Sequence, residues 1–159
     1  MQTLQEHLNI KNYGPTPYWM IPYQCFMGRW EGVCKTFDPK GIFIESSTVH
    51  MDVYWMNEEK TKWHLHEHFD NLYEVGETVF HSDIDVVDRF CTSENAMVKI
   101  EGSMLTPYNY VFTIWSSVSK TTVYNNHYFI DENNRRIITH KVRDDKTHIY
   151  QIQDFVRVG

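Results

Sequence analysis

Three histidines stand two residues apart in the segment KTKWHLHEHFDN, residues 60–71. Side chains alternate between the two faces of a β-strand, so His64, His66 and His68 would share one face of such a strand. The opposite face would carry three apolar residues and a carboxylate: Trp63, Leu65, Glu67 and Phe69. Clustered imidazoles suit proton transfer or metal binding, whereas a carboxylate on a buried face is a candidate acid or base. The chemistry therefore depends on which face points inward.

Two orientations of this strand are open. Burying Trp63, Leu65 and Phe69 gains more free energy than burying three imidazoles, which favours histidines outside or at a subunit contact. Glu67 would then lie inside, where an unpaired carboxyl has a raised pKa. In the opposite orientation, His66 would act as an acid or base inside a cavity. The spacing after HLH does not match a cupin metal site, so we expect no metal.

Composition points to one soluble domain without a nucleic-acid partner. The chain has 159 residues, of which 42% are hydrophobic, enough for one domain with a core. Fifteen basic residues among 21 acidic ones argue against binding to nucleic acid or an anionic membrane. The N-terminal stretch lacks the pattern of a signal peptide, and no apolar run reaches the roughly 18 residues of a membrane span. The three cysteines are odd in number and widely spaced, which favours reduced thiols over disulfides, so we expect a cytoplasmic location.

From residue 26 onward the sequence predicts almost only β-structure. Turn signals such as FDPKG at 37–41 and DENN at 131–134 separate the candidate strands. These strands are 27–37, 42–55, 61–70, 77–82, 86–91, 96–105, 108–117, 121–130, 135–143 and 147–157. Closure into a barrel removes exposed strand edges. We therefore predict an all-β fold, one antiparallel barrel of about 8–10 strands over residues 26–159, after an arm rich in proline and aromatic residues over 1–25.

The polarity pattern predicts a cavity inside this barrel. Neither face of strands 108–117 and 121–130 is cleanly polar, and tyrosine or histidine on an inner face fits an interior that holds a ligand or water. Aromatic residues make up 15% of the chain and would supply flat walls. The residues expected to contact a hydrophobic ligand are Trp30, Cys34, Trp63, Leu65, Phe69, Tyr110 and Phe112.

The segment CFMGRWEGVCKTFDPKG, residues 25–41, places Gly28-Arg29-Trp30 at the start of the first long strand. This GxW resembles the signature of lipocalins and the wider calycin superfamily. With the late segment HYFIDENNRRIITHKVRDD, the chain is similar to lipocalin-like domains of unknown function related to the phycobiliprotein bilin lyases. The resemblance implies a barrel in which the tryptophan closes one end and a basic side chain packs over it. Four arginines are candidates for that position: Arg135, Arg136, Arg143 and Arg157.

The resemblance also implies a function on small organic molecules. The T-D-Y motif and disulfides of secreted lipocalins are absent, so an intracellular member is the better match. We expect a carrier of a hydrophobic or conjugated small molecule, with Tyr128 and His140 adding polar contacts. The alternative is an isomerase or cyclase without a cofactor, in which Glu67, His66 or His127 moves a proton. A homodimer through the histidine-rich strand is a further expectation.

Overall fold

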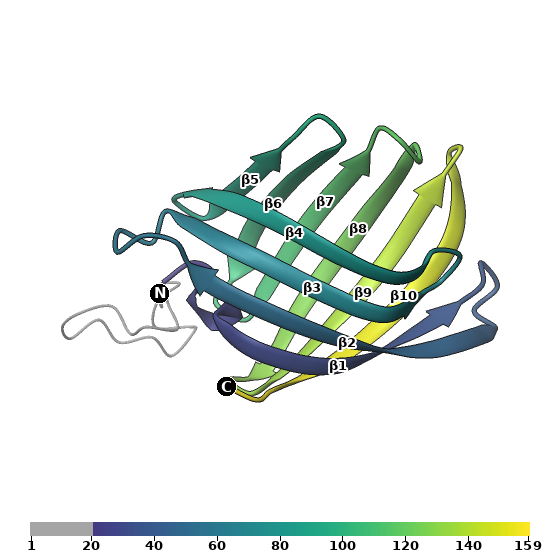
Figure 1. Ribbon diagram of the computed structural model, residues 1–159, viewed down its shortest axis with the longest axis horizontal. Helices are drawn as coiled ribbons and strands as arrows, with labels where there is room; N and C mark the ends of the chain where they lie inside the picture. The colour runs from purple at the N-terminus through teal and green to yellow at the C-terminus, as the bar shows by residue number, and fades with distance from the viewer. Residues whose placement is uncertain (1–20) are drawn as a thin grey trace, which may run out of the picture.

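The structure, a computed structural model, describes residues 21–159, so most of the predicted arm lies outside the described residues. Ten antiparallel strands form a closed barrel, in which each strand pairs with the next and β1 pairs with β10 (Figure 1). The predicted all-β barrel is therefore confirmed. The elements are η2 (Gln24–Phe26), β1 (Gly28–Phe37), β2 (Phe43–Trp55), β3 (Lys62–Leu72), β4 (Gly76–Val87), β5 (Phe90–Glu94), β6 (Val98–Thr106), β7 (Asn109–Ser116), β8 (Thr121–Asp131), β9 (Asn134–Arg143) and β10 (Lys146–Arg157). Within residues 21–159, no helix is long and apolar enough to cross a membrane.

The predicted strand boundaries differ from the structure most clearly around β4 and β5. Strands were predicted at 77–82 and 86–91, whereas β4 continues to Val87 and β5 begins at Phe90. Asp88 adopts φ 59°, in the left-handed region typical of tight turns. The prediction at 86–91 was wrong because this turn lies inside it.

The inner face of β1 follows the predicted alternation. Trp30 and Cys34 are buried, and Gly32 lies between them on the same face. A Cβ atom at Gly32 would lie 2.5 Å from the ring of Phe155 and 2.6 Å from the carbonyl oxygen of Asp154. Glycine is therefore needed here for β1 and β10 to approach each other.

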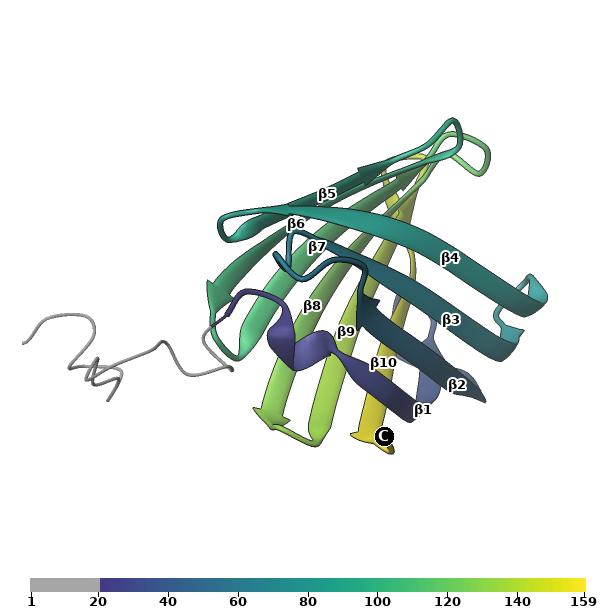
Figure 2. The ribbon, with the colours of Figure 1, turned by 60° about the vertical axis from the view of Figure 1, so that its left-hand side comes forward.

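One end of the barrel is closed by η2, the short 3₁₀ helix that precedes β1 (Figure 2). Tyr23 and Phe26 are buried there, and the Tyr23 hydroxyl donates to the carbonyl of Arg89 at 2.9 Å. Arg157 donates to the carbonyls of Met27 and, at 2.9 Å, of Cys25. These bonds attach the segment before β1 to the last strand of the barrel.

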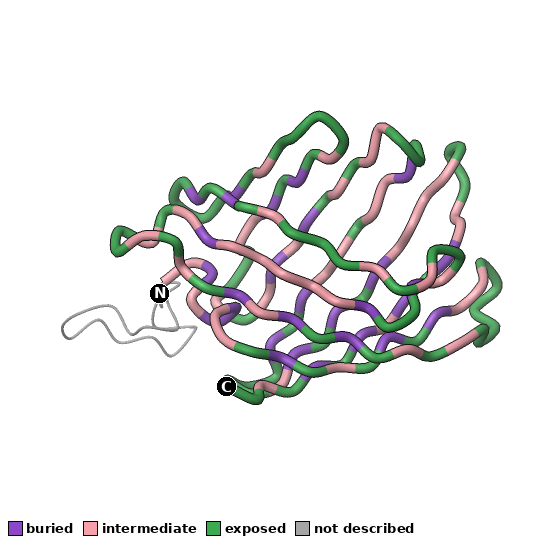
Figure 3. Tube along the Cα trace, in the orientation of Figure 1, coloured by how far each residue is buried: buried purple, intermediate pink, exposed green. Residues whose placement is uncertain are grey.

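The barrel is more open alongside β4. Only Asp85–Val87 of β4 pair with β5, through Phe90–Thr92. Phe80 pairs with Glu67 across β3 and β4 and so points to the inner face, yet its side chain is 43% exposed. Figure 3 shows largely exposed and intermediate residues along β4 and at the neighbouring hairpin tips. Solvent therefore reaches the inner wall from this side.

Candidate functional site

A cavity of about 60 Å³ lies inside the barrel beneath η2. Its apolar wall is formed by Phe26, Met51, Trp63, Leu65, Ile84, Ile100, Phe112, Ile114 and Ile137. Its polar lining is formed by Glu67, Asn125, His127, Arg135 and Gln153. Pockets for drug-sized ligands measure roughly 300–1,000 Å³, so this cavity suits a compact occupant.

Arg135 of β9 carries a buried guanidinium into this cavity, with 1% of the residue exposed. Its Nη2 donates to the Sδ of Met51 at 3.0 Å, whereas Nε and Nη1 have no hydrogen-bond partner among the described residues. The guanidinium carbon lies 4.6–5.5 Å from four ring centroids, those of Phe26, Trp30, Phe129 and Phe155. Burial lowers the pKa of Arg135 to about 10, so the side chain stays charged at neutral pH. The aromatic faces offset part of the cost of burying that charge.

The predicted basic cover of Trp30 consists of two arginines. The guanidinium carbons of Arg157 and Arg135 lie 4.3 and 4.6 Å from its ring centroid. Arg136 instead points outward and pairs with Asp154 at 2.7 Å. The remaining candidate, Arg143, lies at the opposite end of β9.

Three further residues that line the cavity each carry a buried polar atom with no hydrogen-bond partner within residues 21–159. These atoms are Nε1 of Trp63, Nδ1 of His127 and Oε1 of Gln153. Native proteins hydrogen-bond nearly all of their buried polar groups. Water or a ligand inside the cavity is the natural partner for the groups of this set that face it.

Glu67 is the carboxyl group that lines the same cavity. Burial raises its pKa to about 6, and the positive charges of Arg135 and Lys141 lower it in part. No hydrogen bond links Glu67 to another side chain in the described part of the chain. A carboxyl with a pKa near neutrality is able to give or take a proton under physiological conditions.

His127 contributes a neutral imidazole to the wall. Burial lowers its pKa well below the ordinary value, and the nearby charge of Arg135 lowers it further. The ring lies between Phe26, with centroids 5.3 Å apart, and Phe112, at 4.8 Å. His127 can donate or accept one hydrogen bond inside the cavity, but it carries no charge at neutral pH.

The structure brings together only part of the predicted site. Of the predicted ligand-binding and catalytic residues, those that line the cavity are Trp63, Leu65, Glu67, Phe112 and His127. Others are buried in the barrel but do not line it: Trp30, Cys34, Phe69 and Tyr110. Of the two orientations left open for this strand, the structure shows the favoured one, with Trp63, Leu65 and Phe69 inward.

Three predicted site residues lie on the outer face of the barrel and need correction: His66, Tyr128 and His140. Each is adjacent in its strand to a residue that points inward, and alternation then places it outside. The Tyr128 side chain is 39% exposed beside buried His127. His140 stacks on the Tyr150 ring at 5.0 Å. These three side chains therefore do not line the cavity.

The histidines of β3 form contacts on the outer surface. His64 Nδ1 lies 2.6 Å from Asp83 Oδ1, and His68 Nε2 lies 3.2 Å from Glu77 Oε1. His66 stacks in parallel on His81, with ring centroids 4.5 Å apart. Among the described residues, no group of three or more histidine, cysteine, aspartate or glutamate side chains is arranged to hold a metal ion.

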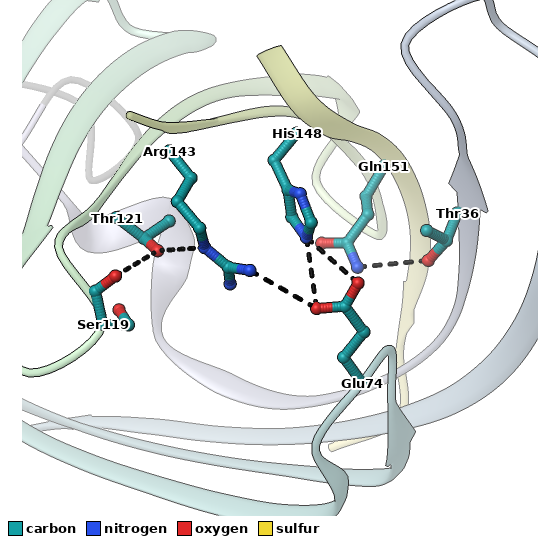
Figure 4. A network of polar contacts seen from close by, with 7 residues as sticks. All are labelled: Thr36, Glu74, Ser119, Thr121, Arg143, His148 and Gln151. Carbon is teal, nitrogen blue, oxygen red and sulfur yellow. Dashed lines mark hydrogen bonds and ion pairs between the residues drawn. The ribbon is translucent and has the colours of Figure 1, made fainter. Parts of the chain in front are cut away.

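The mouth of the barrel opposite η2 is bridged by a polar network (Figure 4). Glu74, in the turn between β3 and β4, contacts His148 of β10 at 3.2 Å and Arg143 of β9 at 3.5 Å. Arg143 Nε also donates to the Thr121 hydroxyl at 3.3 Å. The register of β10 shifts between Thr147 and Ile149, and such a bulge re-aims a side chain. The network thus links strands on opposite sides of the mouth.

The cysteines supply no activated nucleophile. Cys25, Cys34 and Cys91 are free and buried. Burial raises the pKa of each thiol to about 11, so all three are protonated at neutral pH. Their contribution is packing.

The polar site residues that the sequence analysis missed are Asn125, Arg135 and Gln153, and the missed apolar ones are Phe26, Met51, Ile84, Ile100, Ile114 and Ile137. Arg135 was considered only as a cover for Trp30. Its alternation with Ile137 in RRIITHK is the signal that could have placed it inside. The general preference of arginine for the surface hid that signal.

Comparison with known proteins supports the fold. No protein-family model matches the chain, and no curated protein matches it by sequence. The S-type phycobiliprotein lyase CPES from Guillardia theta is similar in structure, with a TM-score of 0.66 and 9% identity over 86% of this chain and 90% of that one. A protein of unknown function from the DUF3598 family, from Nostoc punctiforme, has a TM-score of 0.70 and 12% identity over 90% of this chain. This chain covers 52% of that protein, about half of its length. The resemblance to domains related to phycobiliprotein lyases is thus confirmed at the level of the fold.

Proposed function

We propose that the barrel binds a compact, mainly apolar organic molecule in the cavity beneath η2. The observation that carries this proposal is the combination of an apolar wall with buried polar atoms that have no hydrogen-bond partner in the described part of the chain. A purely structural core would be filled by side chains and would leave few such atoms unbonded. Ligand pockets, by contrast, combine apolar walls with a few polar groups that orient the ligand.

The volume of the cavity narrows the class of ligand. At about 60 Å³ it holds a few waters as it stands, and a small organic molecule requires the wall to yield slightly, since a cavity that takes benzene measures about 150 Å³. An extended pigment would require a much larger movement of the wall residues. A compact molecule that enters from the more open side along β4, where Phe80 is accessible, is the simpler occupant.

A cavity-filling variant tests this function. Ile114 lines the cavity, so Ile114→Phe should reduce the affinity for compact apolar ligands by about tenfold or more. Thr113→Phe is the matched control, because Thr113 is exposed on the outer face of the same strand. Thermal shift and native mass spectrometry with a panel of small apolar molecules supply the readout. If the wild-type protein binds no member of the panel, or both variants bind equally well, the proposal is wrong.

Glu67 supports a second candidate, an isomerase or cyclase without a cofactor. Its pKa of about 6 and its place on the cavity wall suit proton transfer to a bound substrate. Glu67→Gln keeps the shape of the side chain and removes the exchangeable carboxyl proton. An enzyme would lose turnover by about 10²-fold or more with binding largely kept, whereas a carrier would show only a change in affinity.

A further inference from the structure

We propose that the ligand of this cavity carries a carboxylate, and that the carboxylate binds against Arg135 while the apolar body occupies the rest of the cavity. This inference rests on the proposed function and goes beyond it, because it names the chemical class of the ligand, a small organic acid. It depends on the hydrogen-bonding groups and the charge that the inner wall presents.

The hydrogen-bonding groups of the wall include several donors without a partner among the described residues. Arg135 presents N–H groups on Nε and Nη1, and Trp63 presents the N–H of its indole, none of which has a partner among the described residues. Arginine and tryptophan side chains donate and cannot accept. A ligand group that only accepts therefore matches them best, and an ionised carboxylate is such a group. Hydrogen bonds to it from a guanidinium are stronger than neutral ones.

The charge inside the cavity leads to the same ligand. Arg135 is buried and keeps its positive charge at neutral pH. Glu67 on the same wall acts on it as an opposite charge, but no ion pair between the two side chains is found within residues 21–159. Four aromatic rings surround the guanidinium, but rings neutralise no charge. A carboxylate brings one negative charge to one arginine, whereas a phosphate ester would bring about two.

The acceptors of the wall indicate a second feature of the ligand. Oε1 of Gln153 is buried and has no partner within residues 21–159, and Glu67 borders the same cavity. Both groups accept hydrogen bonds, so a hydroxyl or N–H on the ligand would satisfy them. A compact acid with an additional donor, such as a hydroxy acid, would therefore match the wall more fully than a plain acid.

Matched pairs of ligands test the carboxylate directly. The probes are isobutyrate, hexanoate and benzoate, each compared with its primary amide, which has the same size and no charge. Isothermal titration at pH 7.5 should show the acid of at least one pair binding about tenfold or more tightly than its amide. If amides bind as tightly as acids, the inference is wrong while the proposed function stands. If neither acids nor amides bind and the apolar panel also fails, the proposed function is wrong as well.

Two arginine variants assign the preference to its side chain. Arg135→Met keeps much of the side-chain volume and removes the charge. In this variant the acid and its amide should bind with about the same affinity. Arg136→Met is the matched control, since the neighbouring Arg136 faces outward and pairs with Asp154; it should keep the wild-type preference. Retention of the acid preference in Arg135→Met would overturn the assignment.

A third variant covers the case in which Arg135→Met does not fold. Trp63→Phe removes one indole N–H donor from the wall and keeps an aromatic ring. It should weaken binding of the acid by several-fold more than binding of the amide. An equal loss for both ligands would contradict a carboxylate bound among these donors.

Discussion

At the scale of single residues, Glu67 and Arg135 place opposite charges on the wall of one apolar cavity. The sequence favoured an inward position for Glu67, because burying Trp63, Leu65 and Phe69 gains more free energy than burying the three histidines, and the structure places Glu67 on the cavity wall. Its role as an acid or base stays a prediction. Arg135 could not be assigned to the cavity in the same way, since its position depends on how β9 packs against β1 and β10. Arg135 therefore adds a positive charge to the interior that the alternation of side chains along the strands did not predict.

The raised pKa of Glu67 predicts a pH-dependent stability. The folded protein holds the proton up to a pH of about 6, while the unfolded chain releases it near the ordinary value of 4.5. The folded state therefore binds more protons between these values, so the contribution of Glu67 to the free energy of unfolding falls as pH rises from 4.5 to 6. The loss should reach about 2 kcal/mol at most, at 1.36 kcal/mol per pKa unit.

Urea denaturation at pH 4.5 and 6.5 measures this contribution. The difference in unfolding free energy between wild type and Glu67→Gln should change by about 1–2 kcal/mol between the two pH values. Glu58→Gln, at an exposed position in the loop after β2, is the control. A pH-independent difference for Glu67→Gln would contradict a buried carboxyl with a raised pKa.

At the scale of elements, the strands were predictable because turn residues and alternation mark them locally. Most boundaries agree to within a few residues, and the failure at β4 and β5 follows from the turn at Asp88, which lacks a glycine or proline signal. The faces of the strands were harder to predict. His127 and Tyr128 were both proposed for the site although adjacent residues on a strand face opposite ways, and the structure places only His127 inside.

Gly32 is predicted to be essential for the pairing of β1 with β10. In Gly32→Ala the new methyl group would meet the ring of Phe155 and the backbone of Asp154, so the free energy of unfolding should fall by about 2 kcal/mol or more. Gly41→Ala is the comparison: a Cβ there meets nothing within 4 Å, and only the positive φ of 83° imposes a cost of about 1 kcal/mol. Equal losses by denaturant titration would show that the close approach of β1 and β10 is not limiting.

Glu74 lies two residues before β4, so the network at the mouth borders the open side of the barrel through which the ligand is proposed to enter. The network is therefore predicted to control ligand exchange more than stability. Glu74→Gln weakens the contacts to His148 and Arg143, which are partly exposed, so stability should change by less than about 1 kcal/mol. Association and dissociation of a bound ligand should both become faster by several-fold, with little change in affinity. Stopped-flow fluorescence measures the two rates. Glu77→Gln, on the outer face of β4, should leave both unchanged.

At the scale of the whole molecule, the barrel combines one closed end with one accessible side. The GxW segment and the many short strands made the fold predictable, because both are local features of the sequence. The sequence predicted that an aromatic-lined cavity exists. Its volume and its buried polar atoms without hydrogen-bond partners among the described residues could not be predicted, because they depend on the register between strands that are distant along the chain. A homodimer through the outer histidines of β3 stays a prediction.

The most direct test of binding inside the barrel is the NMR signal of the tryptophan indole N–H groups during a benzoate titration. Trp63 lines the cavity and its indole N–H has no partner in the described chain, whereas Trp115 is exposed on the outer face. Spectra of Trp63→Phe and Trp115→Phe assign the two signals. We predict that the Trp63 signal shifts and saturates while the Trp115 signal stays in place. A Trp63 signal that does not move under saturating benzoate or any other member of the ligand panel would contradict a binding site within the barrel.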